Sequence, residues 1–150
     1  MNELRFQRLS PDASLPSRAH PGDAGFDLSC IAGFTIPPGQ RVLVGTGVAV
    51  EIPHGCAGLI LPRSGLALKY GISLVNAPGL IDAGYRGELK VLLLNTDVTH
   101  PFTAEPGSRI AQLVIVECSL AAPQWAESLE PAHRGDGGFG SSGLAQSVDA

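Results

Sequence analysis

The chain has 150 residues and a formal net charge of −4 at pH 7, with a sequence pI near 5.4. Its length favours a single domain. Its acidic balance argues against a protein that binds a nucleic-acid backbone, which needs a basic surface. A nucleotide substrate stays open, because such a substrate requires only a few local cations. No apolar run approaches the length of a membrane span, and the first residues lack the apolar stretch of a secretory signal.

The three cysteines, Cys30, Cys56 and Cys118, are widely spaced along the chain. An odd number of cysteines without a CxxC pair gives no disulfide framework. This pattern predicts buried free thiols in a reducing compartment. We therefore expect a cytoplasmic protein that has neither a nucleic acid nor a membrane as a partner.

Short apolar runs separated by Gly, Pro, Asp and Ser predict a series of strands. They recur at spacings of roughly ten to fifteen residues, which is typical of an all-β sandwich or barrel. Only residues 64–70 suit a short helical turn, and no internal repeat is present. The predicted strands cover residues 4–9, 25–30, 40–52 (interrupted at Gly45 and Gly47), 56–61, 72–76, 89–95 and 110–117.

The last part of the chain differs from the rest in composition. From residue 121 onward it is polar, and residues 134–143 read RGDGGFGSSG. A glycine-rich run of this kind is poorly suited to a strand. The expected organisation is therefore one domain, with its body in residues 1–120 and a flexible C-terminal tail in residues 121–150.

The segment 76–88, NAPGLIDAGYRGE, is the most informative part of the sequence. Asp82 lies between two glycine turns and two apolar runs, where a carboxylate is well placed to hold a water molecule or a sugar hydroxyl. A purely structural turn also accommodates Asp-Ala-Gly, because Asp and Gly both suit turns. Tyr85 in this segment and Phe139 in the tail lie among glycines, where an aromatic ring is available to stack on a base.

Two further segments suit phosphate groups. Residues 62–65 combine the Arg63 guanidinium, the Ser64 hydroxyl and a turn of backbone N–H groups, and Arg134 precedes a second glycine-rich run. Neither segment is a P-loop. Asp23 and Asp27 suit Mg²⁺, which prefers carboxylates together with waters and substrate phosphates. The alternative is that Asp23 shapes a turn and Asp27 is exposed to solvent.

In chain order, these segments resemble the five motifs of the trimeric deoxyuridine triphosphate nucleotidohydrolase (dUTPase) family. The likeness covers nearly the whole chain with the motifs in the same order. The matching segments are residues 22–28 (GDAGFDL), 62–67 (PRSGLA), 76–88, 107–113 (GSRIAQL) and 134–143.

The resemblance implies a distorted β jelly roll of the β-clip kind that assembles as a homotrimer with shared active sites. The implied reaction is Mg²⁺-dependent hydrolysis of dUTP to dUMP and pyrophosphate by in-line attack of water on the α-phosphate. This activity limits uracil incorporation into DNA and supplies dUMP for dTMP synthesis. The tail with its fifth motif is expected to close over a site when nucleotide binds.

The resemblance also assigns roles to residues. Asp82 matches the acid that activates the attacking water, Asp27 matches the acid that holds Mg²⁺ through water, and Tyr85 matches the ring under the deoxyribose. The other nucleoside contacts match Asn76, Leu80, Ile81 and Lys90, and Phe139 matches the ring that stacks on uracil. The phosphate contacts match Arg63, Ser64, Gly65, Gln112, Arg134, Gly140, Ser141 and Ser142.

Two rival functions remain at this point. A dCTP deaminase of the same fold superfamily requires a pocket that reads the 4-amino group of cytosine, whereas residues 81–88 resemble the uracil-reading hairpin. A non-catalytic nucleotide-binding regulator gives no reason to keep Asp82, Arg134 and Phe139 together.

Overall fold

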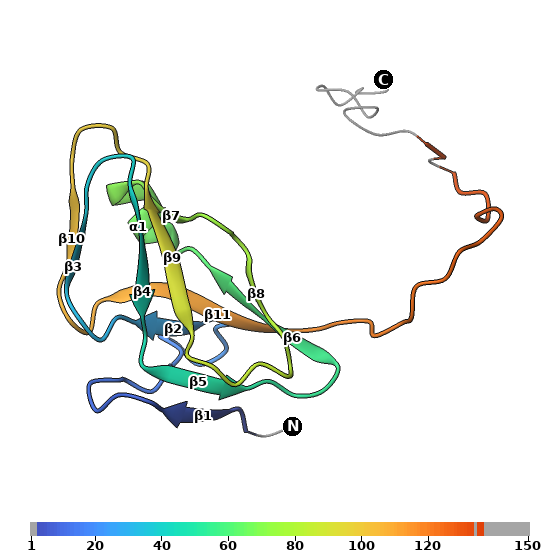
Figure 1. Ribbon diagram of the computed structural model, residues 1–150, viewed down its shortest axis with the longest axis horizontal. Helices are drawn as coiled ribbons and strands as arrows, with labels where there is room; N and C mark the ends of the chain where they lie inside the picture. The colour runs from blue at the N-terminus through green and yellow to red at the C-terminus, as the bar shows by residue number, and fades with distance from the viewer. Residues whose placement is uncertain (1–2, 134, 137–150) are drawn as a thin grey trace. The chain divides into compact units, whose positions relative to one another are not determined.

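The computed structural model describes residues 3–133, 135 and 136. The chain divides into two units, Met1–Leu120 and Ala121–Ala150. The first unit contains all the strands and the helix of the described residues (Figure 1). The predicted residues Arg134, Phe139, Gly140, Ser141 and Ser142 lie outside the described part of the chain.

The first unit is built almost entirely from short strands. Its one helix is α1 (Ser64–Tyr70). The strands are β1 (Arg5–Arg8), β2 (Phe26–Ser29), β3 (Phe34–Ile36), β4 (Arg41–Gly45), β5 (Val48–Glu51), β6 (Cys56–Leu61), β7 (Ile72–Leu74), β8 (Gly79–Ile81), β9 (Lys90–Asn95), β10 (Phe102–Ala104) and β11 (Arg109–Glu117).

The strands form four small antiparallel sheets, and their neighbours are mostly distant in sequence. The largest has the order β2-β11-β6-β8, and a second has the order β4-β9-β7. The pairs β1–β5 and β10–β3 complete the set, and in Figure 1 they lie at opposite ends of this unit. The all-β prediction with one short helix is confirmed.

The core explains why the two larger sheets stay together. Burial alternates along β9, where Val91, Leu93 and Asn95 face inward, and Ile110 and Leu113 of β11 are also buried. Removing an aliphatic side chain of this size from water contributes about 1.5–3 kcal/mol. Asn95 is satisfied inside, because its Nδ2 donates to the carbonyls of Ile36 (3.0 Å) and His100 (2.9 Å).

Differences from the predicted elements are local. The predicted run 40–52 is two strands, β4 and β5, because the chain turns at Thr46 and Gly47 and Gly47 has a φ of 67°. The strands β3, β8 and β10 were not predicted. Each has three residues, which is too short for a period-two pattern to stand out; β7 is equally short but lies in the longer predicted run 72–76.

The cysteine prediction is only partly correct. All three thiols are free, and Cys30 is buried, but Cys56 is half-buried and Cys118 is exposed. Cys118 follows the end of β11, where the chain leaves the core, and its backbone N–H donates to the Gly55 carbonyl (2.9 Å). The expectation that Cys118 is buried is therefore wrong.

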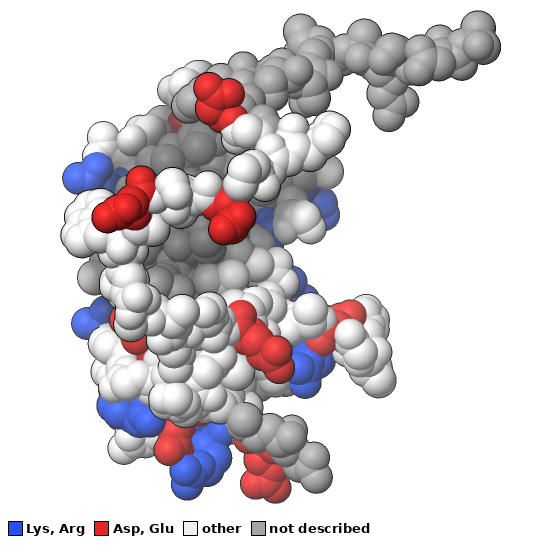
Figure 2. Space-filling view, turned by 90° about the vertical axis from the view of Figure 1, so that its right-hand side faces the viewer, with Lys and Arg blue, Asp and Glu red and all other residues white. Residues whose placement is uncertain are grey.

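None of the helices in the described residues is long and apolar enough to cross a membrane. On the face drawn in Figure 2, Lys and Arg side chains are interspersed with Asp and Glu side chains rather than gathered in one patch.

Candidate active site

Asp27 connects two arginines at the end of the largest sheet. Its Oδ1 lies 3.0 Å from Arg63 Nε, and its Oδ2 accepts a hydrogen bond from Arg109 Nη1 (2.9 Å). Only 16% of the Asp27 side chain is exposed. Arg63 Nη1 also donates to the backbone carbonyl of Arg109 (3.2 Å). The Arg63 guanidinium is therefore held from two directions, and Asp27 is not the solvent-exposed acid of the alternative interpretation.

A cavity of about 670 Å³ opens beside this cluster. It brings together five predicted residues, namely Asp27, Arg63, Ser64, Gly65 and Gln112. Their strands explain this proximity, because β2 and β11 pair with Asp27 opposite Gln112. Arg63 and Ser64 follow β6, the next strand of the same sheet. A guanidinium, a hydroxyl and an amide at one cavity form a set of donors that suits phosphate oxygens.

Gln112 is fixed at this cavity by its surroundings. Its Nε2 donates to the Pro62 carbonyl (2.9 Å). Gly25 lies so close that a Cβ there would approach Gln112 Oε1 to 2.5 Å. A side chain at position 25 of the first motif would therefore displace the Gln112 amide of the fourth motif from this position.

The helix α1 determines where Ser64 and Gly65 lie. Arg63 is its N-cap residue, with extended backbone and no side-chain cap hydrogen bond, so Ser64 is the first helical residue and not a cap. Gly71 ends the helix at a φ of 64°, and its backbone N–H donates to the Ala67 carbonyl (3.0 Å). The cavity also contacts Lys69 and Tyr70 of α1.

Two residues that line the cavity and one that contacts Asp27 beside it had no assigned role in the sequence interpretation. Lys69 adds a second cation, and Tyr70 adds a half-exposed ring. Arg109 holds Asp27, although it does not line this cavity. A basic residue at the end of α1 also suits the helix dipole, so its sequence position alone gives no signal of a site. Arg109 lies in the fourth motif, and this position was the sequence feature that could have indicated its role.

Asp23 lies at the same cavity and shapes the turn before β2. Its Oδ2 accepts a hydrogen bond from the His20 backbone N–H (2.9 Å), and its own N–H donates to the His20 carbonyl (3.2 Å). This is the turn-shaping role considered for Asp23 from the sequence. Among the described residues, no group of three or more His, Cys, Asp and Glu is arranged to hold a metal.

The second group of predicted residues lies just before β8, within it, in the connection from β8 to β9 and at the start of β9. We call this segment, residues 76–90, the hairpin, although β8 pairs with β6 and β9 pairs with β4 and β7. Asp82 is exposed, and its carbonyl accepts the Tyr85 backbone N–H (3.0 Å), which closes a turn. Leu80 and Tyr85 are 62% and 44% exposed, so two apolar side chains of this hairpin face outward in one copy of the chain. Asn76 is also exposed, and Ile81 is half-buried against the core.

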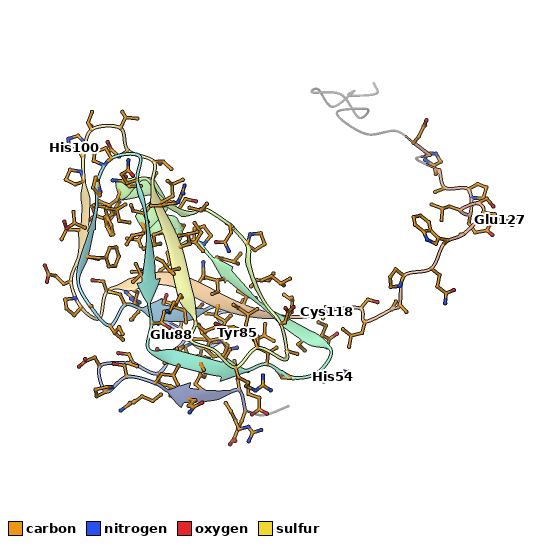
Figure 3. All side chains as sticks on the ribbon, in the orientation of Figure 1. His54, Tyr85, Glu88, His100, Cys118 and Glu127 are labelled. Atoms are coloured by element: carbon orange, nitrogen blue, oxygen red, sulfur yellow. The ribbon has the colours of Figure 1, made fainter. Side chains whose placement is uncertain are left out.

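The ring of Tyr85 has a defined position. Its hydroxyl donates to the Glu88 carbonyl (3.0 Å), and Figure 3 shows both residues at the end of the unit where β5 runs. A Cβ on Gly87 would lie 2.6 Å from Tyr85 Cζ, so this conformation of the ring requires glycine there. Lys90, at the start of β9, forms an ion pair with Glu88 (3.5 Å).

The hairpin residues Asn76, Asp82, Tyr85 and Lys90 do not line the cavity beside Arg63. One copy of the chain thus presents the residues predicted to bind phosphate and those predicted to bind the nucleoside at separate places. Nothing is described of the fifth motif's Arg134 and Phe139.

Comparison with known sequences identifies relatives over most of the chain. The sequence model of the dUTPase family matches residues 11–143. A Rhodococcus erythropolis protein named deoxyuridine 5'-triphosphate nucleotidohydrolase is 55% identical over 140 residues, which cover 93% of this chain and 85% of that protein. A Mycolicibacterium gilvum protein of the same name is 54% identical over 147 residues, covering 93% of this chain and 94% of that protein.

Solved structures of phage dUTPases share the fold. A mutant dUTPase of Staphylococcus bacteriophage 80alpha with dUpNHpp has a TM-score of 0.89 at 33% identity, covering 96% of this chain and all of that one. A mutant dUTPase of phage phi11 of S. aureus, described with a structural Mg(II) ion, has a TM-score of 0.79 at 28% identity, covering 85% and 98%. The predicted jelly roll is confirmed. On the family match and the relatives that are more than half identical, this chain belongs to the dUTPase family.

Proposed function

We propose that this protein hydrolyses dUTP to dUMP and pyrophosphate. The predicted enzyme class, dUTP diphosphatase, is confirmed by the family and by the names of the relatives. The structural observation that supports the reaction best is the cavity at which Asp27, Arg63 and Gln112 meet. It offers fixed donors to a phosphate chain in an otherwise acidic protein.

Arg63 is the central phosphate ligand in this proposal. Its Nε and Nη1 are already engaged by Asp27 and the Arg109 carbonyl, which orients the remaining N–H groups of the planar guanidinium. Ser64, Gly65 and Gln112 add neutral donors, and Lys69 adds a second positive charge at the same cavity. Preorganised donors of this kind stabilise charge that develops on phosphate oxygens without reorganising during the reaction.

Asp82 is the proposed base that orients and activates the attacking water. A carboxylate in this role needs correct placement more than a raised pKa. Its place in a turn closed by the Tyr85 N–H fits such a fixed acceptor. Water held by Asp82 would attack the α-phosphorus in line with the leaving pyrophosphate, so catalysis depends on positioning and charge neutralisation.

The same hairpin is the proposed reader of the nucleoside. The Tyr85 ring is fixed by its hydrogen bond to the Glu88 carbonyl, so it cannot easily retreat from a bulkier sugar. A 2′-hydroxyl would then clash with it, which favours deoxyribose. Asn76, Leu80, Ile81 and Lys90 are the proposed uracil and sugar contacts around this ring.

Mg²⁺ is the proposed cofactor. It commonly retains waters and binds through one or two carboxylates together with substrate phosphates. The Asp27 carboxylate lies at the cavity, so it can supply one such ligand. Both of its oxygens are also paired with arginines, which suits contact with the ion through water rather than direct coordination. Asp27 would hold the ion through a water molecule, and the bound ion would neutralise the charge of the triphosphate.

A homotrimer with shared active sites is the proposed assembly. The phosphate-binding cavity and the Asp82 hairpin are separate surfaces of one copy, so joining them between copies would complete a site. Under this proposal, residues 121–150 form a tail that brings Arg134, Gly140, Ser141 and Ser142 to the phosphates and Phe139 to the uracil.

The proposed cellular role follows from the reaction. Removal of dUTP limits uracil incorporation into DNA, and the product dUMP serves dTMP synthesis. The cytoplasmic location expected from the sequence stays a prediction, as does the absence of nucleic-acid and membrane partners. A dCTP deaminase is the second candidate, but no observation in the described residues favours it.

The role of Asp82 is tested by Asp82→Asn in the full chain. The amide keeps the shape of the side chain but cannot accept a proton, so binding of a non-hydrolysable dUTP analogue should persist while pyrophosphate release falls by at least about 10²-fold. The exposed Asp12 provides the matched control, because Asp12→Asn should leave turnover unchanged. Normal turnover in Asp82→Asn would show that another group activates the water.

A further inference from the structure

The turn that carries Asp82 and Tyr85 is anchored at both ends but lightly held between them. At its start Ile81 pairs with Gly58 of β6, and at its end the Leu89 N–H donates to the Val48 carbonyl (2.8 Å). A cavity of about 560 Å³ borders Ala83 and Gly84. Ala83 packs against the core, but Gly84 and the residues after it in the turn have open space on one side.

Arg86 ties the turn together from within. Its Nη1 donates to the Ala83 carbonyl (2.6 Å) and to the Tyr85 carbonyl (2.8 Å). These two carbonyls lie on either side of Gly84, the residue with the greatest backbone freedom in the turn. One guanidinium nitrogen thus fixes the peptide between Ala83 and Gly84, one residue after Asp82, and the peptide between Tyr85 and Arg86.

Glu51, at the end of β5, holds Arg86 from outside the turn. Its Oε1 lies 3.8 Å from Arg86 Nη2, and its Oε2 lies 2.5 Å from Arg5 Nη2 on β1. Among the described residues, this is the one ion pair that joins the turn, residues 82–87, to a strand. The β1–β5 sheet is therefore connected electrostatically to the turn.

We propose that Arg86, held by Glu51, is a positioning residue for dUTP hydrolysis. It fixes the direction of the Asp82 carboxylate through the backbone of the turn, without contacting the nucleotide itself. This inference rests on the proposed function, because it presumes that Asp82 orients the attacking water.

The exposure of the pair determines what its loss does. The side chains of Arg86 and Glu51 are 53% and 41% exposed, and ion pairs this open to solvent contribute little to folding stability. Catalysis is more sensitive, because a displacement of about 1 Å in a reacting group costs roughly 10²-fold in rate. Loss of the pair should therefore lower kcat strongly while Tm stays almost unchanged.

Arg86→Met in the full chain tests the proposal. It keeps an unbranched side chain but removes both hydrogen bonds, so kcat for dUTP should fall by roughly tenfold or more while KM and Tm stay nearly unchanged. Arg86→Lys retains a donor and should recover part of kcat. Glu51→Gln should lower kcat less, and the double variant should be no slower than Arg86→Met, because the two residues share one network.

The matched control is Arg8→Met on β1, since the exposed Arg8 side chain forms no hydrogen bond or ion pair among the described residues; its kcat should stay at the wild-type value. A normal kcat in Arg86→Met would overturn the proposal. A lower kcat together with a clearly lower Tm would also overturn it, because the residue would then act through folding stability. Asp82→Asn measured alongside separates the two claims. If Asp82→Asn is inactive and Arg86→Met is normal, only the positioning role fails, whereas an active Asp82→Asn overturns both.

Discussion

At the scale of single residues, Asp27 is the group whose surroundings decide its function. Its two oxygens face two guanidinium groups, so its first effect is to hold Arg63 at the cavity. Asp27→Asn keeps one acceptor but loses the charge, and kcat/KM for dUTP should fall by about tenfold, equivalent to about 1.4 kcal/mol. Steady-state kinetics against wild type and Asp12→Asn check this. An unchanged kcat/KM would mean that Arg63 is held without Asp27.

A second prediction at this scale concerns pH. The backbone N–H of Thr99, that of His100 and the Thr99 hydroxyl hold the pKa of Asp97 well below the usual carboxyl range. A depressed pKa in the folded state adds stability above the unfolded pKa of about 4, and this is lost as pH falls toward the folded value. Asp97→Asn should therefore have a lower Tm than wild type at neutral pH, and the gap should close on acidification. A gap that is constant with pH would contradict this.

At the scale of elements, the end of α1 shows how one backbone position supports the site. Gly71 has a φ of 64°, and a Cβ there would approach Thr96 Oγ1 to 2.8 Å. Gly71→Ala should lower the free energy of unfolding by about 1–3 kcal/mol. Gly65→Ala, in the first turn of α1 with open space around it, should raise this free energy by up to about 1 kcal/mol. Urea unfolding of both variants would show whether their free energies of unfolding change in opposite directions. An equal loss in both would mean that the backbone conformation at these two glycines does not decide the effect.

The elements also explain which parts of the fold could be predicted. Strands of four or more residues, such as β9 and β11, carry enough alternating or apolar positions to be recognised. The pair β3–β10 has three residues on each side, and its register depends on a partner far away in sequence. In the site, Arg63 and Asp27 were found because their motifs carry charge among glycines. Lys69 was missed because a basic residue near a helix end has an ordinary structural explanation.

At the scale of the whole molecule, the separation of the two groups of residues is the main result. The residue pattern by itself does not indicate whether Asp82 and Arg63 meet within one copy or between copies, and only the family resemblance implies sites shared between copies. The proposed assembly predicts a particle with three times the mass of the 15.5 kDa chain. A chain that ends at His133 should still form a particle of three chains and keep its β-sheet spectrum but lose most dUTP turnover, because Arg134 and Phe139 are removed. Light scattering and circular dichroism provide the controls, and full activity of the shortened chain would contradict a role for the tail.

The most direct test of the account is pyrophosphate release from dUTP with Mg²⁺, measured beside dCTP, dTTP and UTP while ammonia is followed in the dCTP sample. The account predicts rapid release from dUTP, little from dCTP or dTTP because the hairpin reads uracil, and little from UTP because Tyr85 rejects the ribose. Ammonia from dCTP would contradict the uracil-reading hairpin and favour the deaminase. Absence of pyrophosphate from every nucleotide would contradict hydrolysis altogether.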